Sequence, residues 1–180
     1  MRARLLDFIK FRGSNDSLFE SFQDFNVFFA KKLRMLKMPA NAALIVIPPL
    51  ASLHRMGSYD LHFNDSAIQR TFGFKLLISE WVQPIVDAGR QSKARIILIG
   101  AHSMGSNMPA KFENLQGTKQ IQHLNEELAK YCAKENLTFL NPYNLTKGQY
   151  SMDGVHYAWR GNLRKLLPIS NVLKFTKEQQ

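Results

Sequence analysis

Short apolar runs alternate with longer amphipathic segments along this chain. The runs at residues 42–47 and 94–100 are continuous, β-prone and closed by proline or glycine, which is typical of strands buried on both faces of a sheet. Elsewhere, apolar side chains recur every three or four residues, as on one face of a helix. The pattern predicts strands at residues 5–11, 42–47, 94–100 and 137–140. It predicts helices at residues 18–38, 66–88, 119–135 and 159–167.

Two prolines fall within or directly after these predicted helices. Pro84 is expected to kink the second helix or divide it, because proline lacks a backbone N–H and its ring clashes with the preceding turn. Pro168 is expected to interrupt the last helix for the same reason. Residues 101–117 and 141–152 are rich in turn-forming residues and are predicted as loops.

The order of strand and helix, repeated four times, predicts an α/β fold. Strands that alternate with helices form a mainly parallel sheet covered on both faces, which gives a three-layer α/β/α sandwich of the flavodoxin-like kind. Neither an internal repeat nor a linker divides the chain, so a single domain is expected over residues 1–170, followed by a polar tail at 171–180. Functional sites of such sheets form beyond the carboxyl ends of the strands.

Asp153 and His156 are the strongest candidates for catalysis. They stand three residues apart on a turn that contains Gly154, after the last predicted strand and before the last helix. That spacing lets the carboxylate accept a hydrogen bond from one ring nitrogen while the other nitrogen takes a proton from a nucleophile. The alternative is an ordinary surface pair or a helix cap, because this spacing is common by chance.

The segment around this pair resembles the SGNH/GDSL hydrolases, in particular their PC-esterase-like branch. The most specific match is Met-Asp-Gly-Val-His-Tyr at residues 152–157, followed by a terminal helix. Residues 137–146, and the strand and loop at 43–57, are also similar. The resemblance implies an SGNH-like sandwich that acts on acyl esters as a hydrolase or acyltransferase. It implies that His156 activates a serine and that Asp153 orients the histidine.

The family's G-D-S nucleophile motif is absent from this chain. In one alignment, the strand at 5–11 is the family's second strand, Gly13 donates to the oxyanion, and the first strand with its serine is missing. In the other, it is the first strand, and Ser14 or Ser17 is the nucleophile. The single helix before the strand at 42–47 favours the first alignment. The chain is therefore an esterase that uses one of these serines, a chain truncated at its N-terminus, or a domain that has lost its nucleophile, and whether it is an enzyme stays open.

Ser103 offers a different nucleophile. Residues 101–105, Ala-His-Ser-Met-Gly, nearly match the G-x-S-x-G elbow of α/β-hydrolase lipases. That elbow requires a helix directly after the serine, whereas helical spacing resumes here only near residue 119. Ser103 is therefore the weaker candidate, and a lipase or esterase of the α/β-hydrolase kind is the alternative enzyme.

His54 and Arg55 follow the second predicted strand. They could line a pocket for an anionic or sugar substrate, although a solvent-exposed loop explains them equally simply. A non-catalytic domain that holds a glycan or another anionic ligand is the alternative from outside the hydrolases. The substrate expected from these residues is a small acyl ester or glycan-type molecule.

Charge and composition limit the classes of partner that the chain is expected to bind. The chain has 24 basic and 14 acidic residues, which gives a net charge of +10. Such a surface can attract nucleic acid, but no zinc-finger spacing or RNA-binding motif supports a specific nucleic-acid partner.

No metal-ligand spacing and no phosphate-binding loop is present, so neither a metal nor a cofactor is expected. No apolar run is long enough to span a bilayer. Compartment and oligomeric state do not follow from the sequence.

Overall fold

The computed structural model describes residues 31–32, 35, 42–47, 78–110, 117–154 and 156–175 of the 180-residue chain. The predicted strand at 5–11 lies outside the described residues, as does most of the predicted helix at 18–38, of which residues 31, 32 and 35 are helical. The site and the elements around it fall mainly in the second half of the chain.

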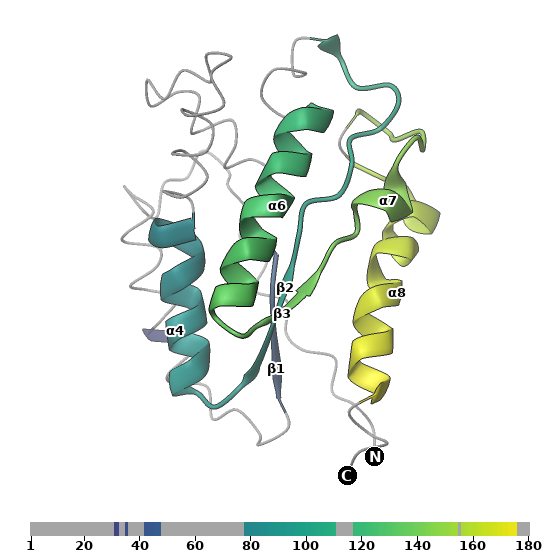
Figure 1. Cartoon of the computed structure of the whole chain (residues 1–180). Coiled ribbons are helices and arrows are strands. Elements are labelled where there is room, and N and C mark those ends of the chain that lie inside the picture. Colours follow the sequence, from purple (N-terminus) through teal and green to yellow (C-terminus); the bar gives the residue numbers. More distant parts are fainter. Residues whose placement is uncertain are drawn as a thin grey trace.

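The described strands form a parallel sheet in the order β1-β2-β3 (Figure 1). The strands are β1 (Ala43–Val46), β2 (Arg95–Ile99) and β3 (Thr138–Leu140). Leu44 lies opposite Ile96 in the register of the first pair. All three match predicted strands, because each is a short and mainly apolar run. Residues 96–99 of β2 are buried, whereas β3 and most of β1 are half-buried.

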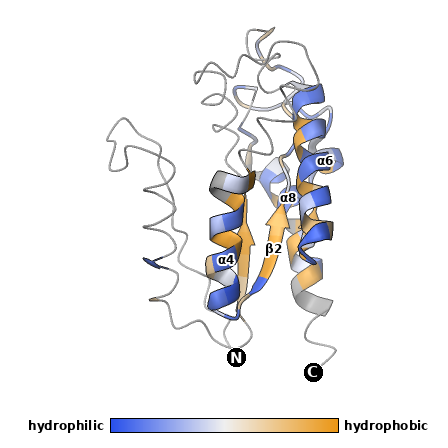
Figure 2. Cartoon of the chain, turned by 60° about the vertical axis from the view of Figure 1, so that its left-hand side comes forward, coloured by the Kyte–Doolittle hydropathy of each residue, from blue (hydrophilic) through white to orange (hydrophobic). Residues whose placement is uncertain are grey.

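Helices cover both faces of this sheet. One face carries α4 (Gln83–Gln91) and α6 (Thr118–Lys134), and the other carries α8 (Trp159–Phe175). Figure 2 shows that the apolar side of α4 faces the strands while its polar side faces outward. The arrangement is a three-layer α/β/α sandwich with a parallel sheet, which confirms the predicted fold class.

The central strand β2 contributes side chains to the hydrophobic cores on both faces of the sheet. Its side chains alternate between the two faces, as the pleat of a strand requires. Ile96 and Leu98 pack into the core beneath α4 and α6. Ile97 and Ile99 pack into the core beneath α8, where they meet Ile169. Because both faces are covered, an unbroken apolar run is the sequence that this position requires.

The two helical prolines lie at different positions in their helices. Pro84 lies in the first turn of α4, directly after a π-helical segment at Ile78–Val82. A first-turn residue needs no helical N–H partner, so the proline is tolerated where the π-helix changes to an α-helix. The two segments run on without a break, because Val82 between them keeps helical backbone angles, so the expected break is not observed. Pro168 lies inside α8, which continues to Phe175, so the expected interruption was wrong. Burial of Ile169 against β2 helps to offset the cost of about 3 kcal/mol that a proline imposes inside a helix.

The predicted loop at 141–152 contains a short helix, α7 (Tyr143–Thr146). Tyr143 and Thr146 are both buried, and Tyr143 belongs to the core beneath α6. One helical turn is too short to leave a periodic pattern, which is why the sequence did not predict it. Its burial fixes the start of the segment that carries Asp153 and His156. In the described part of the chain, no helix is both long and apolar enough to cross a bilayer.

Candidate active site

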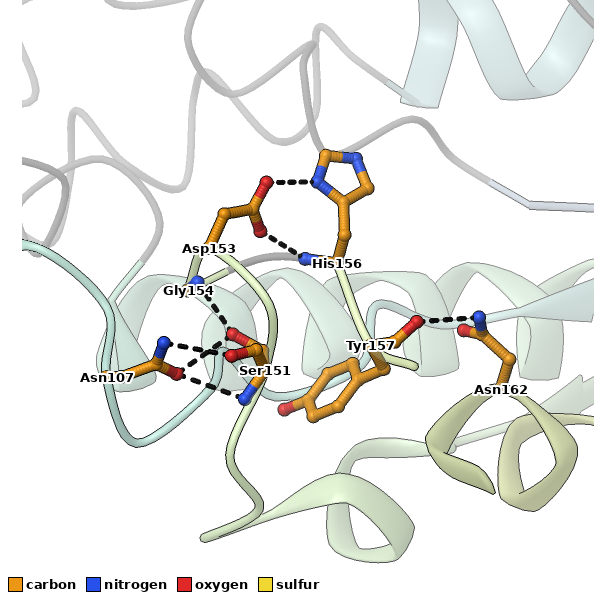
Figure 3. A network of polar contacts seen from close by, with 7 residues as sticks. All are labelled: Asn107, Ser151, Asp153, Gly154, His156, Tyr157 and Asn162. Atoms are coloured by element: carbon orange, nitrogen blue, oxygen red, sulfur yellow. Dashed lines mark hydrogen bonds and ion pairs between the residues drawn. The ribbon is translucent and has the colours of Figure 1, made fainter. Parts of the chain in front are cut away.

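The turn between α7 and α8 brings the carboxylate of Asp153 onto His156 (Figure 3). Asp153 Oδ1 accepts the backbone N–H of His156 at 2.7 Å, and Oδ2 lies 2.6 Å from Nδ1 of the same residue. A carboxylate only accepts hydrogen bonds, so Nδ1 carries a proton, and in the neutral form of the ring Nε2 keeps a lone pair. The histidine side chain is 76% exposed, which leaves Nε2 open to a substrate or nucleophile.

Gly154 gives this turn its shape. Its φ of +91° lies in the region that glycine adopts most readily. A Cβ at this position would lie 2.7 Å from Cα of Met108, on the loop after β2. The carbonyl of Gly154 accepts the N–H of Gly105 at 2.9 Å. Glycine therefore allows the turn to pack directly against the neighbouring loop.

Asn107 and Ser151 join the same two loops (Figure 3). Asn107 Oδ1 accepts both the N–H and the hydroxyl of Ser151 at 3.0 Å, and Asn107 Nδ2 donates to the Ser151 carbonyl at 2.9 Å. Ser151 Oγ in turn accepts the N–H of Gly154 at 2.6 Å. These contacts position the turn from the side opposite the Asp153 carboxylate. Sequence analysis missed both residues, since the pairing spans 44 positions.

Tyr157 anchors the backbone that follows His156. Its ring is buried, and its hydroxyl lies 2.9 Å from the carbonyl of Ser103 and 3.2 Å from that of Thr146, so the one proton is shared between two acceptors. Its own carbonyl accepts the side-chain N–H of Asn162 at 2.8 Å, at the start of α8. His156 thus projects from a segment that is fixed on both sides.

Ser103 is part of this buried network. It is 4% exposed, its hydroxyl donates to Thr146 Oγ1 at 2.9 Å, and its backbone N–H donates to the same oxygen at 3.1 Å. A weaker contact of 3.4 Å joins its Oγ to the hydroxyl of Tyr157. His156 is not among these partners, and residues 101–109 contain no helix. This environment favours a structural role for Ser103 over that of a nucleophile.

His102 is a second histidine in the neighbourhood. Its Nδ1 lies 2.7 Å from the carbonyl of Ser103 and must donate to it. Burial lowers the pKa of His102 to about 4, against the raising effect of that hydrogen bond and with further lowering by Lys165 and His156. The ring is therefore neutral at pH 7, and its edge packs on Tyr157 with ring centroids 5.4 Å apart.

A cavity of about 290 Å³ lies beside the turn. Gly105 and Met108, which line it, are also the residues that approach Gly154. Its other lining residues come from the loop after β2, from α6 and from α7 and the turn that follows. They are Ser103, Met104, Ser106, Thr118, Tyr143, Lys147 and Gly148. The cavity is near the lower end of the range for small-molecule sites, about 300–1,000 Å³.

The other predicted site residues lie outside the described residues. They are Gly13, Ser14, Ser17, His54 and Arg55. Among the residues that the structure does describe, no three histidine, cysteine, aspartate or glutamate side chains are grouped so that they could hold a metal ion.

Comparison with known proteins shows which solved structures have a similar fold. The sequence matches no protein-family model and no curated protein. A candidate acylhydrolase from Bacteroides fragilis superposes with a TM-score of 0.55 at 17% identity, over 87% of this chain and 71% of that one. The chain shares the fold of that protein. A GDSL-like lipase from Bacteroides thetaiotaomicron agrees, with a TM-score of 0.50 at 16% identity, over 87% of this chain and all of that one (100%).

These two structures support the fold that the SGNH/GDSL resemblance implied, and the fold alone. At such low identity the likeness concerns the arrangement of strands and helices rather than individual side chains. The roles of Asp153 and His156 therefore rest on their own geometry.

Proposed function

We propose that this chain is an SGNH-type acyl-ester hydrolase or acyltransferase of the PC-esterase-like kind, with His156 as its general base. The observation that carries the proposal is the two-point contact of Asp153 with the backbone N–H and Nδ1 of His156. One carboxylate thereby fixes both the orientation and the tautomer of the imidazole. The fold supports the reaction class, since the two neighbours with this fold are named as an acylhydrolase and a GDSL-like lipase.

In the first half of the reaction, a serine hydroxyl attacks the ester carbonyl carbon. His156 Nε2 takes the serine proton as the new C–O bond forms and the carbonyl π electrons move onto oxygen. When the tetrahedral intermediate collapses, the bond to the leaving alcohol breaks, and Nε2–H returns the proton to the departing oxygen. Asp153 stabilises the imidazolium that exists between these two proton transfers.

The second half repeats the same steps with water or with an acceptor alcohol. His156 takes its proton, the oxygen attacks the acyl-serine, and the serine leaves with the proton that Nε2 returns. Water gives hydrolysis, and an alcohol gives acyl transfer. The exposed position of His156 is compatible with either acceptor.

For the nucleophile, we propose Ser14 or Ser17 ahead of Ser103. The argument is one of elimination within the resemblance, because the hydroxyl of Ser103 is buried and donates to Thr146. In the same scheme His54 and Arg55 contact the substrate, whereas Gly13 would donate its backbone N–H to the oxyanion in the other alignment, in which the nucleophilic serine is missing from the chain.

We assign the acyl group to the cavity beside the turn. Met104 and Met108 give it flexible apolar walls, and Ser106, Thr118 and Lys147 add polar groups. Its volume of about 290 Å³ suits a short acyl group better than a long fatty chain.

Labelling with a fluorophosphonate, followed by mass spectrometry of the modified peptide, tests this proposal. The wild-type chain is expected to be labelled on Ser14 or Ser17, and S103A is expected to retain the label. H156Q should lose the label while H123Q, which changes a histidine on α6, should keep it.

Each other outcome overturns a stated part of the proposal. Modification of Ser103 itself would favour the α/β-hydrolase alternative. A folded wild-type chain that takes no label would contradict the enzymatic proposal and favour a binding domain for a glycan or another anionic ligand.

A further inference from the structure

Lys165 on α8 is a half-buried cation. Its Nζ lies over the ring of Tyr157, 4.6 Å from the centroid, and burial lowers its pKa to about 8. It is still mainly protonated at pH 7. In the part of the chain that the structure describes, no carboxylate pairs with it, whereas Lys130 and Arg90 each have a glutamate within 2.9 Å.

The position of Lys165 connects it to the proposed active site. Tyr157, on which it rests, directly follows His156 in the chain. His102 forms a T-shaped contact with the same ring, and its pKa is lowered first by burial and further by Lys165 and His156. The ammonium and the proposed catalytic imidazole therefore share one neighbourhood.

Among the described residues, no carboxylate lies against the ammonium of Lys165. The carboxylate of Asp153 is already taken up by His156, with Oδ2 only 2.6 Å from Nδ1. His102 adds no charge at pH 7, because its ring is neutral. A half-buried ammonium without a counter-ion gains more from an arriving anion than an exposed one, because less of the attraction is screened by water.

We propose that Lys165 is a specificity-determining residue that binds an anionic group, a carboxylate or a phosphate, on the ester substrate. The inference rests on the proposed function, since it assigns the substrate class of that same site. The anionic group would lie several bonds from the ester carbonyl, so that the ester reaches His156 while the anion reaches the ammonium. The cation–π contact with Tyr157 limits the freedom of the lysine and reduces the entropy lost on binding.

Binding of two matched esters tests this without turnover. Monomethyl glutarate carries one carboxylate and dimethyl glutarate carries none, and both can be titrated into the full chain while the side-chain NMR signals of His102 are followed. Monomethyl glutarate is expected to shift these signals saturably and dimethyl glutarate to leave them unchanged. A parallel titration with methyl phosphate shows whether phosphate replaces carboxylate, and binding of either anion satisfies the inference.

Variants separate Lys165 from the general positive charge of the chain. K165Q is expected to raise the Kd for monomethyl glutarate at least about fivefold, as the loss of one partly screened ion pair implies. K165R keeps the charge and should bind within about twofold of the wild type. R164Q removes the same charge from an exposed neighbour on α8 and should also bind within about twofold. Equal weakening by K165Q and R164Q, or equal binding of the neutral diester, would overturn the inference.

The role of Lys165 and the proposed esterase function can be overturned separately, because binding and fluorophosphonate labelling are measured in different experiments. A chain that is labelled by fluorophosphonate but shows no preference for the anionic ester would retain its esterase assignment and lose the role of Lys165. A chain that binds monomethyl glutarate through Lys165 but takes no label would lose the catalytic assignment and retain an anion site. Urea unfolding of K165Q shows whether any loss of binding in this variant arises from misfolding.

Discussion

Asn107 forms three hydrogen bonds with Ser151, two through its side-chain oxygen and one through its side-chain nitrogen. This pairing joins the loop after β2 to the segment that carries Asp153 and His156. The position of the imidazole therefore depends on a residue 49 positions earlier in the chain, through contacts with the backbone rather than with the ring.

Replacement of Asn107 should loosen the turn. N107A leaves the buried N–H of Ser151 without its acceptor and is expected to lower the free energy of unfolding by about 2 kcal/mol. N107D keeps an acceptor at Oδ1 but turns a carboxylate oxygen toward the Ser151 carbonyl in place of the donor, so it is also expected to lower the free energy of unfolding. Urea unfolding of the two variants measures both losses. Equal stability of N107A and the wild type would show that the contact does not hold the loops together.

Gly154 and Gly148 form a natural comparison. Both have positive φ, +91° and +74°, but a Cβ at Gly148 would meet nothing within 4 Å whereas one at Gly154 would meet the backbone of Met108. G148A is expected to cost about 1 kcal/mol for its backbone conformation alone. G154A should cost clearly more and should also displace Asp153 from His156. Thermal unfolding with an NMR spectrum of His156 checks both effects, and equal costs would contradict the close approach of the two loops.

Thr146 gives a test of the role of Ser103. T146V removes the hydroxyl that accepts from both the N–H and the Oγ of Ser103, and is expected to destabilise the fold by about 1–3 kcal/mol. T146S retains that hydroxyl and should be milder. S103A should lose roughly 1 kcal/mol while keeping fluorophosphonate reactivity. Loss of reactivity in a folded S103A chain would instead identify Ser103 as the nucleophile.

His102 makes stability depend on pH in the acid range. Its pKa is about 4 when folded, below the ordinary value of 6.5. Between these values the unfolded chain binds a proton that the folded chain does not, so stability falls as the pH decreases from 6.5 towards 4. The loss is of the order of 2–3 kcal/mol.

The variant H102N isolates this effect. Asparagine keeps a side-chain N–H donor but cannot titrate, so the acid dependence of its urea midpoint should be flatter than that of the wild type. H123Q removes a histidine that pairs with Glu126 on the surface of α6 and serves as the control. Parallel acid profiles for H102N and the wild type would mean that His102 is not a buried neutral group.

Local patterns predicted the scaffold well because burial on both faces constrains every residue of a strand. The apolar run around Ile97 allowed one interpretation, and the spacing of Ile121, Leu124 and Leu128 allowed one helix. Pro168 misled the prediction because the energy that keeps α8 continuous comes from tertiary packing of Ile169, which the local sequence does not contain.

The candidate site was predictable only where its chemistry is local. Asp153 and His156 are three residues apart, so one turn brings them together. Asn107 with Ser151, and Ser103 with Thr146, pair across 44 and 43 positions through side chains common in any loop. The sequence does not distinguish Lys165 from the other basic residues of α8, because its contact with the ring of Tyr157 depends on the fold.

The catalytic pairing of Asp153 and His156 is tested most directly by ester hydrolysis. The measurement is kcat/KM for 4-nitrophenyl acetate with the wild type, D153N, H156Q and the control H123Q. D153N should fall at least about 100-fold, because the amide can no longer hold Nδ1 protonated, and H156Q should fall as far because the base is gone. H123Q should match the wild type. Hydrolysis by D153N and H156Q at the wild-type rate would contradict the account.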